Sequence, residues 1–141
     1  MPKRIQFSLA SMLLVTFAFA LWFAFAPSVR TYIAIQRLSN EDVAVDGGYA
    51  GLSIQISGEP AAYIESLGPE VNPWLQHALK DSRKFAAAHV LLSRINLNQS
   101  TFGGVSKWNQ MSVSLYGDGS VDFHEDQIPD LVDYWQQFLP E

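Results

Sequence analysis

The sequence of 141 residues contains no cysteine. This absence excludes a disulfide framework, so the fold must depend on its hydrophobic core for stability. A chain of this length is too short for two sizeable globular domains. Once the N-terminal segment is set aside, the remainder is long enough for one core.

Basic residues are scarce beyond Pro27, where seven of them face fourteen acidic residues and the net charge is −7. The densest basic stretch covers residues 80–84, and Asp81 interrupts it. A phosphate backbone requires a continuous basic patch, so the composition excludes nucleic acid as a partner. Most of this acidic surface would also repel anionic lipid headgroups.

Charge is missing altogether from Phe7 to Ala26. As a helix rising about 1.5 Å per residue, this stretch would span about 30 Å, the thickness of the hydrocarbon layer of a bilayer. A helix of a soluble protein should show a sustained polar face, and this one has only three scattered hydroxyl groups. We therefore predict a transmembrane anchor that contacts the lipid bilayer through residues 7–26.

A cleavable signal peptide is the alternative interpretation of this segment. Residues 18–20 and 24–26 both read Ala-Phe-Ala, which fits the small-x-small pattern before a cleavage site. However, cleavage after Ala26 would place Pro27 next to the scissile bond. The apolar run is also longer than the 7–15 residues of a usual signal-peptide core. These two points favour a permanent anchor.

The basic residues near the anchor bear on its orientation. Lys3 and Arg4 precede it, and Arg30 and Arg37 follow it, so their numbers do not decide the topology. A short basic head that stays in the cytoplasm, followed by a translocated domain, is the simplest arrangement. We therefore predict a single-pass membrane protein with a head and anchor over residues 1–27. A small domain over residues 28–141 would lie on the extracytoplasmic side.

The domain shows the pattern of an α+β fold. Apolar residues alternate around Asp46-Gly47-Gly48 and again around Gly117-Asp118-Gly119, which predicts two β-hairpins with glycine turns. We expect both hairpins in one antiparallel sheet. A short helix over residues 28–38 follows the anchor, either as a separate element or as its continuation past Pro27.

Three further helices are predicted to cover this sheet. Asn72 and Pro73 begin a helix that ends near residue 80, and Asp81 or Ser82 caps a second that ends before Asn96. This pair resembles one hairpin of a HEAT-type repeat. No second copy occurs, so a solenoid is excluded. A final helix begins at Pro129, with Leu131, Val132, Trp135 and Phe138 expected on its inner face.

Two histidines lie in the helical region. His89 has apolar neighbours almost all round, which predicts a core-edge histidine satisfied by one hydrogen bond. His77 belongs to the polar side of its helix. A metal site would need another imidazole or a carboxylate three or four residues away on the same face, and neither histidine has a convincing partner of that kind.

The stretch GDGSVDFHED at residues 117–126 resembles the second half of a calcium-binding EF-hand loop. The first half does not fit, because Ser114 and Tyr116 would occupy positions that favour aspartate. The residues upstream alternate as in a strand, whereas an EF-hand needs a helix there. We therefore predict a hairpin turn at Gly117-Asp118-Gly119 in place of a calcium site.

The densest polar group of the chain is His124, Glu125, Asp126 and Asp130. Carboxylates near Pro129 are favoured by the dipole of the helix that begins there. The alternative is an acid/base pair or a divalent metal site formed by His124 with Glu125 or Asp126. The sequence assigns no nucleophile beside them, so no catalytic, cofactor or metal residue is predicted.

The lead Arg-x-x-Phe-Ser-Leu into a leucine-rich span resembles the start of short single-anchor membrane proteins of planctomycete-type bacteria. The words FAAAHVLLSRI and VSLYGDGSVDF and the terminal Tyr-Trp helix are similar to the same group. The resemblance implies location and architecture and no activity. We expect a membrane-anchored, non-catalytic interaction or envelope-associated module. The alternative is a small hydrolase or metal-binding domain that uses His124, Glu125 and Asp126.

Overall fold

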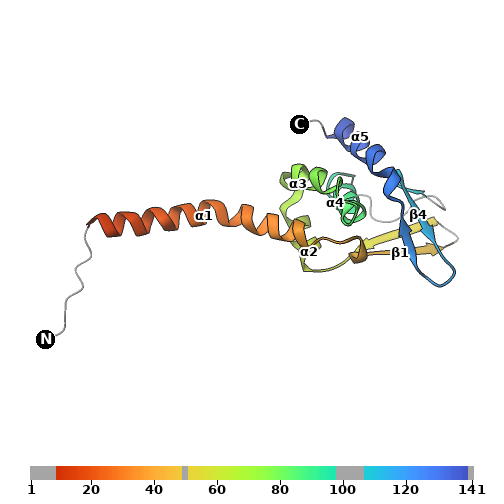
Figure 1. Cartoon of the computed structure of the whole chain (residues 1–141), viewed down its shortest axis with the longest axis horizontal. Helices are drawn as coiled ribbons and strands as arrows, with labels where there is room; N and C mark the ends of the chain where they lie inside the picture. Colours follow the sequence, from red (N-terminus) through yellow and green to blue (C-terminus); the bar gives the residue numbers. More distant parts are fainter. Residues whose placement is uncertain (1–8, 49–50, 98–106, 140–141) are drawn as a thin grey trace.

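The computed structural model describes residues 9–48, 51–97 and 107–139. It shows an α+β fold, as the sequence predicts, with one long N-terminal helix that projects from a small domain (Figure 1). The described strands form two separate antiparallel sheets, one of two strands and one of three. The expectation of a single sheet was therefore wrong.

The first helix, α1, runs without a break from Leu9 to Arg37 and includes Pro27. The helix therefore continues past the proline, which is one of the two possibilities that the sequence left open. Two hydroxyl groups of α1 donate to main-chain carbonyls one turn earlier. Thr16 Oγ1 donates to Met12 O at 2.9 Å, and Thr31 Oγ1 donates to Pro27 O at 3.0 Å. The helix measures about 43 Å at 1.5 Å per residue.

The two ends of α1 have different surroundings. Its first part extends away from every other element as an isolated rod (Figure 1). Near its end, Thr31, Ala34 and Ile35 are buried in the domain. The final turns of α1 therefore belong to the core, and α1 is followed by the short 3₁₀ helix η1, Asn40–Asp42, which Ser39 and Asp42 close with a capping box.

The first hairpin consists of β1, Val43–Gly48, and β2, Gly51–Ile56. Val43 pairs with Ile56 and Gly48 with Gly51, so the connection falls on residues 49 and 50, outside the described residues. The hairpin is confirmed, but its predicted turn was placed too early. Among the described glycines of this hairpin, Gly51 has the positive φ, 114°. Because Val43 pairs with Ile56, Asp46 and Gly47 are paired residues of β1 and do not form the turn.

Four helical segments form the centre of the domain: α2, Glu59–Leu67; η2, Gly68–Val71; α3, Asn72–Ala78; and α4, Phe85–Leu97. Every residue of α4 from Phe85 to Ser93 is buried, which makes this helix the middle of the core. The predicted α3–α4 pair is confirmed. The predicted end of α4 before Asn96 was wrong, because the helix includes Asn96 and ends at Leu97. The side-chain amide of Asn96 donates to Leu92 O one turn earlier and exchanges two hydrogen bonds with the side chain of Asn72.

The second sheet contains β3, Lys107–Trp108; β4, Met111–Leu115; and β5, Val121–Phe123. The hairpin of β4 and β5 matches the prediction, with Val113 opposite Phe123. Strand β3 was not predicted. It joins β4 through Asn109 and Gln110, whose φ angles of 44° and 73° are those of a two-residue hairpin turn.

The chain then passes through η3, Glu125–Gln127, into the last helix, α5, Ile128–Phe138. Leu131 and Trp135 are buried as predicted, but Phe138 is 46% exposed. The reason is that α5 contacts α3 and reaches α4 through Trp135, so its last turn extends past the edge of the core. Phe138 was therefore wrongly placed on the inner face.

Candidate functional site

The alternative site from the sequence comprises His124, Glu125 and Asp126. All three residues are exposed, and the two acids lie in η3. Among the described residues, no group of three or more histidines and carboxylates is arranged to hold a metal ion. Two other residues, which no sequence pattern indicated as site residues, orient the His124 ring.

Those two residues are Ser114 on β4 and Asp122 on β5. Ser114 Oγ lies 2.7 Å from His124 Nε2, and Asp122 Oδ2 lies 3.6 Å from His124 Nδ1. Ser114 and Asp122 are register partners, and Asp122 precedes His124 by two residues on the same strand face. The pairing of β4 with β5 therefore assembles the group, and the expected register of this hairpin was the signal that could have found it.

The order hydroxyl, imidazole, carboxylate is that of a nucleophilic hydrolase site. Here the side chains of His124 and Asp122 are about half exposed, and Ser114 lies on the same open face of the hairpin. Such a site also needs donors for an oxyanion and a cavity that excludes water. Neither of the two hollows described below is lined by any of the three residues.

The turn at residues 117–119 is satisfied from within the chain. Asp118 Oδ1 accepts bonds from Ser120 N at 2.9 Å and from Ser120 Oγ at 2.6 Å, and these bonds hold the pKa of Asp118 below its ordinary value. Gly119 has a φ of 84°, which permits the reversal. This stretch is therefore the predicted hairpin turn, and the carboxylate of Asp118 within it is hydrogen-bonded to Ser120.

His89 is a fully buried residue of α4. Trp135 Nε1 donates to His89 Nδ1 at 2.9 Å, and the Trp108 and Trp135 rings meet the imidazole edge to face at 5.7 and 5.8 Å. The predicted single hydrogen bond is present, although the ring lies inside the core and not at its edge. Burial lowers the pKa of His89 from 6.5 to about 4, against a smaller opposing effect of the Asn109 and Trp108 backbone.

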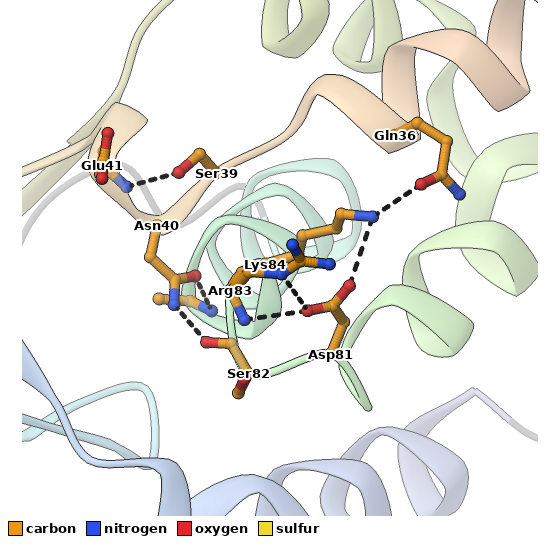
Figure 2. Close-up of polar contacts among 9 residues, drawn as sticks. Gln36, Ser39, Asn40, Glu41, Asp81, Ser82, Arg83 and Lys84 are labelled. Atoms are coloured by element: carbon orange, nitrogen blue, oxygen red, sulfur yellow. Dashed lines mark hydrogen bonds and ion pairs between the residues drawn. The ribbon is translucent and has the colours of Figure 1, made fainter.

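A second polar network joins α1 to the turn before α4. Asn40 Nδ2 donates to Ser82 O at 2.7 Å, and Asn40 Oδ1 accepts from Ala86 N at 2.9 Å (Figure 2). The side chain of Asn40 therefore caps α4 from a distant part of the chain. Asp81 caps the turn that leads into α4, as predicted, because its carboxylate accepts from Arg83 N and its main-chain carbonyl accepts from Phe85 N, whereas the cap by Asn40 was not predicted.

The same network contains a buried lysine. Lys84 Nζ lies 3.0 Å from Gln36 Oε1 at the end of α1 and 3.3 Å from Asp81 Oδ2 (Figure 2). The Arg83 backbone and the Lys84 charge hold the pKa of Asp81 below its ordinary value. We call Gln36, Asn40, Asp81 and Lys84 the junction; it holds the exposed rod of α1 in a set direction relative to the core.

The larger of the two hollows is a groove of about 690 Å³ between α3 and α5. Its apolar lining includes Val132, Phe138 and Leu139, and its polar lining includes Gln76 and Lys80. Among the residues that the structure describes, no aspartate or glutamate lines it, in a domain that carries fourteen acids. Its volume lies within the range of about 300–1,000 Å³ typical of ligand sites. It is therefore the main candidate binding site of the described residues.

No family model, curated protein or solved structure matches this chain. The function must therefore be inferred from the chemistry of the chain itself. Two features carry that inference: the exposed apolar rod of α1 and the groove between α3 and α5.

Proposed function

We propose that this protein is a single-pass, membrane-anchored, non-catalytic interaction module. The observation that carries the proposal is that the apolar first part of α1 is not covered by any other part of the described chain. This is the one helix of the described residues that is long and apolar enough to cross a membrane, and none of its most apolar 18-residue stretch is buried in the protein. Large side chains such as Leu14, Trp22 and Phe23 are more than two-thirds exposed there.

Lipid would remove this apolar surface from water. Each Leu, Phe or Val at the centre of a membrane helix contributes about 0.3–0.6 kcal/mol to insertion, whereas a lysine there costs about 3 kcal/mol. The proposed span is residues 7–26, with Lys3 and Arg4 in the cytoplasm and the domain of residues 28–141 on the other side. The sequence resemblance to single-anchor proteins of planctomycete-type bacteria favours the same location and architecture.

Alkaline extraction of native membranes tests the anchor. The full chain should stay in the pellet, whereas the double variant Leu14→Lys, Phe17→Lys should move to the supernatant. Ser28→Lys is the matched control, because it adds a charge to the exposed part of α1 beyond the proposed span, and it should stay in the pellet. Release of the unchanged chain by the alkaline wash would disprove the anchor.

We further propose that the groove between α3 and α5 binds an extended polypeptide segment with apolar side chains. One side-chain amide in the lining already binds a main-chain carbonyl, since Gln76 Nε2 donates to Leu139 O at 3.1 Å. The lack of carboxylates and the presence of Lys80 favour a segment that is uncharged or acidic. Phe138 offers an exposed aromatic contact at its rim.

Photocrosslinking in the native membrane tests the groove. A photoreactive phenylalanine at Gln136, which lines the groove, should form protease-sensitive adducts, and the same group at Gln55 on β2 should not. Phe138→Ala should reduce the adducts several-fold, whereas the exposed neighbour Gln137→Ala should leave them unchanged. Equal adducts at positions 136 and 55 would contradict a polypeptide site in the groove.

A small hydrolase is the second candidate function, and the contact of Ser114 Oγ with His124 Nε2 is the observation that favours it. Glu125 and Asp126 would then be bystanders. Turnover of an activated ester by the full chain, abolished by Ser114→Ala and by His124→Ala but not by Asp126→Asn, would support this function. Equal turnover by all variants would exclude it.

A further inference from the structure

The second hollow is a small pocket of about 130 Å³ where the end of α1 meets the start of α2. Its lining includes Arg30, Ile33 and Arg37 from α1, and Glu59, Pro60 and Tyr63 from α2. It is well below the range of about 300–1,000 Å³ typical of whole ligands, so it suits a small group such as a phosphate. We call it the juxtamembrane pocket.

Two arginines give this pocket a positive charge. Arg30 and Arg37 are seven residues apart, two helical turns, and therefore lie on the same face of α1. Neither forms an ion pair among the described residues, unlike Arg83, Lys84 and Arg94. The Arg30 guanidinium lies 5.1 Å from the centre of the Tyr63 ring, which leaves its hydrogen-bond donors free for an anion.

One carboxylate, that of Glu59, also lines the pocket and is exposed at its rim. It offsets one of the two positive charges and would repel an anion nearby. The local balance still differs in sign from the remainder of the domain, which is strongly acidic. An anion that approaches the domain would therefore be attracted at this pocket and repelled over most of the other surface.

The Arg30 end of the pocket lies at the height of the lipid headgroups if α1 crosses the bilayer as proposed. Arg30 is four residues beyond residue 26, about 6 Å past the hydrocarbon boundary, and the headgroup layer is about 5–7 Å thick on each side; Arg37 is about 16 Å past the boundary, on the side of the pocket away from the membrane. Helical side chains tilt toward the helix N-terminus, so the Arg37 guanidinium also points back toward the membrane. The direct contacts of α2 with α1 hold the pocket in this position.

Aromatic side chains mark the same level of the molecule. Tyr32 is 52% exposed and Trp74 is 39% exposed, and their rings meet edge to face at 6.4 Å. Exposed tyrosine and tryptophan suit the boundary between hydrocarbon and water, where one end of the ring is apolar and the other is wet.

We infer that the juxtamembrane pocket binds the phosphate of an anionic phospholipid in the leaflet from which the domain emerges. Arg30 and Arg37 would hold the phosphate oxygens, and Ile33 and Pro60 would contact the apolar part next to it. Since the remaining surface is acidic, this contact would be confined to one point and would orient the domain on the bilayer. The inference rests on the proposed membrane anchor.

The test uses the full chain in detergent micelles, with bound phospholipid counted by native mass spectrometry. Phosphatidylglycerol should bind at least tenfold more tightly than phosphatidylcholine. Arg30→Gln, Arg37→Gln should abolish this preference, and Arg30→Lys, Arg37→Lys should retain part of it. The matched control Arg83→Gln, Lys107→Gln removes the same charge from exposed positions outside the pocket and should change the affinity less than twofold.

Three outcomes would overturn the inference: equal binding of both lipids, an equal loss in the control variant, or displacement of the lipid by millimolar inorganic phosphate, which would show a site for free phosphate. Alkaline extraction of the glutamine variant separates this inference from the anchor. If the variant stays in the pellet but loses the lipid preference, both proposals hold. If the unchanged chain is extracted, the anchor itself fails.

Discussion

At the scale of single residues, the most constrained group is the imidazole of His89. An indole N–H is only a donor, so His89 Nδ1 must be the unprotonated nitrogen that accepts from Trp135. The proton of the neutral ring is therefore on Nε2, which has no hydrogen-bond partner among the described residues. A second proton on Nδ1 would break the bond to Trp135 and place a charge in the core.

This arrangement predicts a loss of stability in acid. The folded pKa of His89 is about 4, below its ordinary value of 6.5, so between these values the unfolded chain binds more protons than the folded one. The stability from this group is complete above pH 6.5 and is lost as the pH falls toward 4, by about 3 kcal/mol in total. The groups that surround the ring, Trp108, Trp135, Ser93 and Asn109, do not titrate in this range.

Urea unfolding of the full chain in mild detergent at several pH values provides the measurement. His89→Gln should flatten the dependence between pH 4 and 6.5, even if it lowers stability at pH 7. A variant with the same slope as the unchanged chain would show that other groups cause the acid loss.

At the scale of elements, the junction decides how α1 meets the domain. The start of α4 is buried, and its Ala86 N–H has its acceptor in Asn40 of η1. This single amide therefore links the segment that follows α1 to the central helix of the core. Its second bond, to Ser82 O, fixes the turn that precedes α4.

Asn40→Ala should lower the free energy of unfolding by about 2 kcal/mol, because it removes a helix cap and leaves a buried N–H unpaired. Glu41→Ala is the control, since this adjacent side chain is exposed, and it should change stability by less than about 0.5 kcal/mol. Chemical unfolding of both variants gives the comparison. Equal stability would mean that water replaces the cap.

The β4–β5 hairpin offers a matched pair of glycines. A methyl group added at Gly117 or at Gly119 would meet nothing within 4 Å, but only Gly119 of the two has a positive φ. Gly119→Ala should therefore cost about 1 kcal/mol through backbone strain, whereas Gly117→Ala should be neutral or slightly stabilising. Thermal unfolding distinguishes the two, and equal costs would show that the turn relaxes.

At the scale of the whole molecule, α1 forms a rod that projects from a small acidic domain (Figure 1). The junction joins the two. The core continues into the last turns of α1 through Thr31, Ala34 and Ile35. Motion of the domain relative to the anchor would have to break these contacts. If α1 crosses a bilayer as proposed, the groove and the juxtamembrane pocket should therefore keep a constant height above it.

An intact anchor makes a prediction about the mature chain. Mass spectrometry of the membrane-bound protein should find residues 1–26 attached, because α1 continues unbroken into the core and cleavage would remove the anchor. Protease added from outside sealed cells should digest the domain, whereas protease added outside inverted vesicles should spare it. A mature start at Leu21 or Pro27 would instead identify a signal peptide, and the opposite protection pattern would reverse the topology.

Local sequence patterns were enough for several parts of this protein. Alternation from Met111 to Leu115 and glycine at position 119 specified the second hairpin and its turn, because both signals act over a few residues. The α3–α4 pair and the apolar helix, described from Leu9 onward, were predictable for the same reason. Composition alone also established the acidic character of the domain.

Only the tertiary structure decided the features that join distant parts of the chain. Asn40 as the cap of α4, Ser114 beside His124 and the division of the strands into two sheets all depend on pairings that no local pattern encodes. The same holds for the grouping of Arg30 and Arg37 with Tyr63 on another helix. The physical reason is that a hydrogen bond or ion pair depends on distance in space, and the core packing around α4 sets those distances.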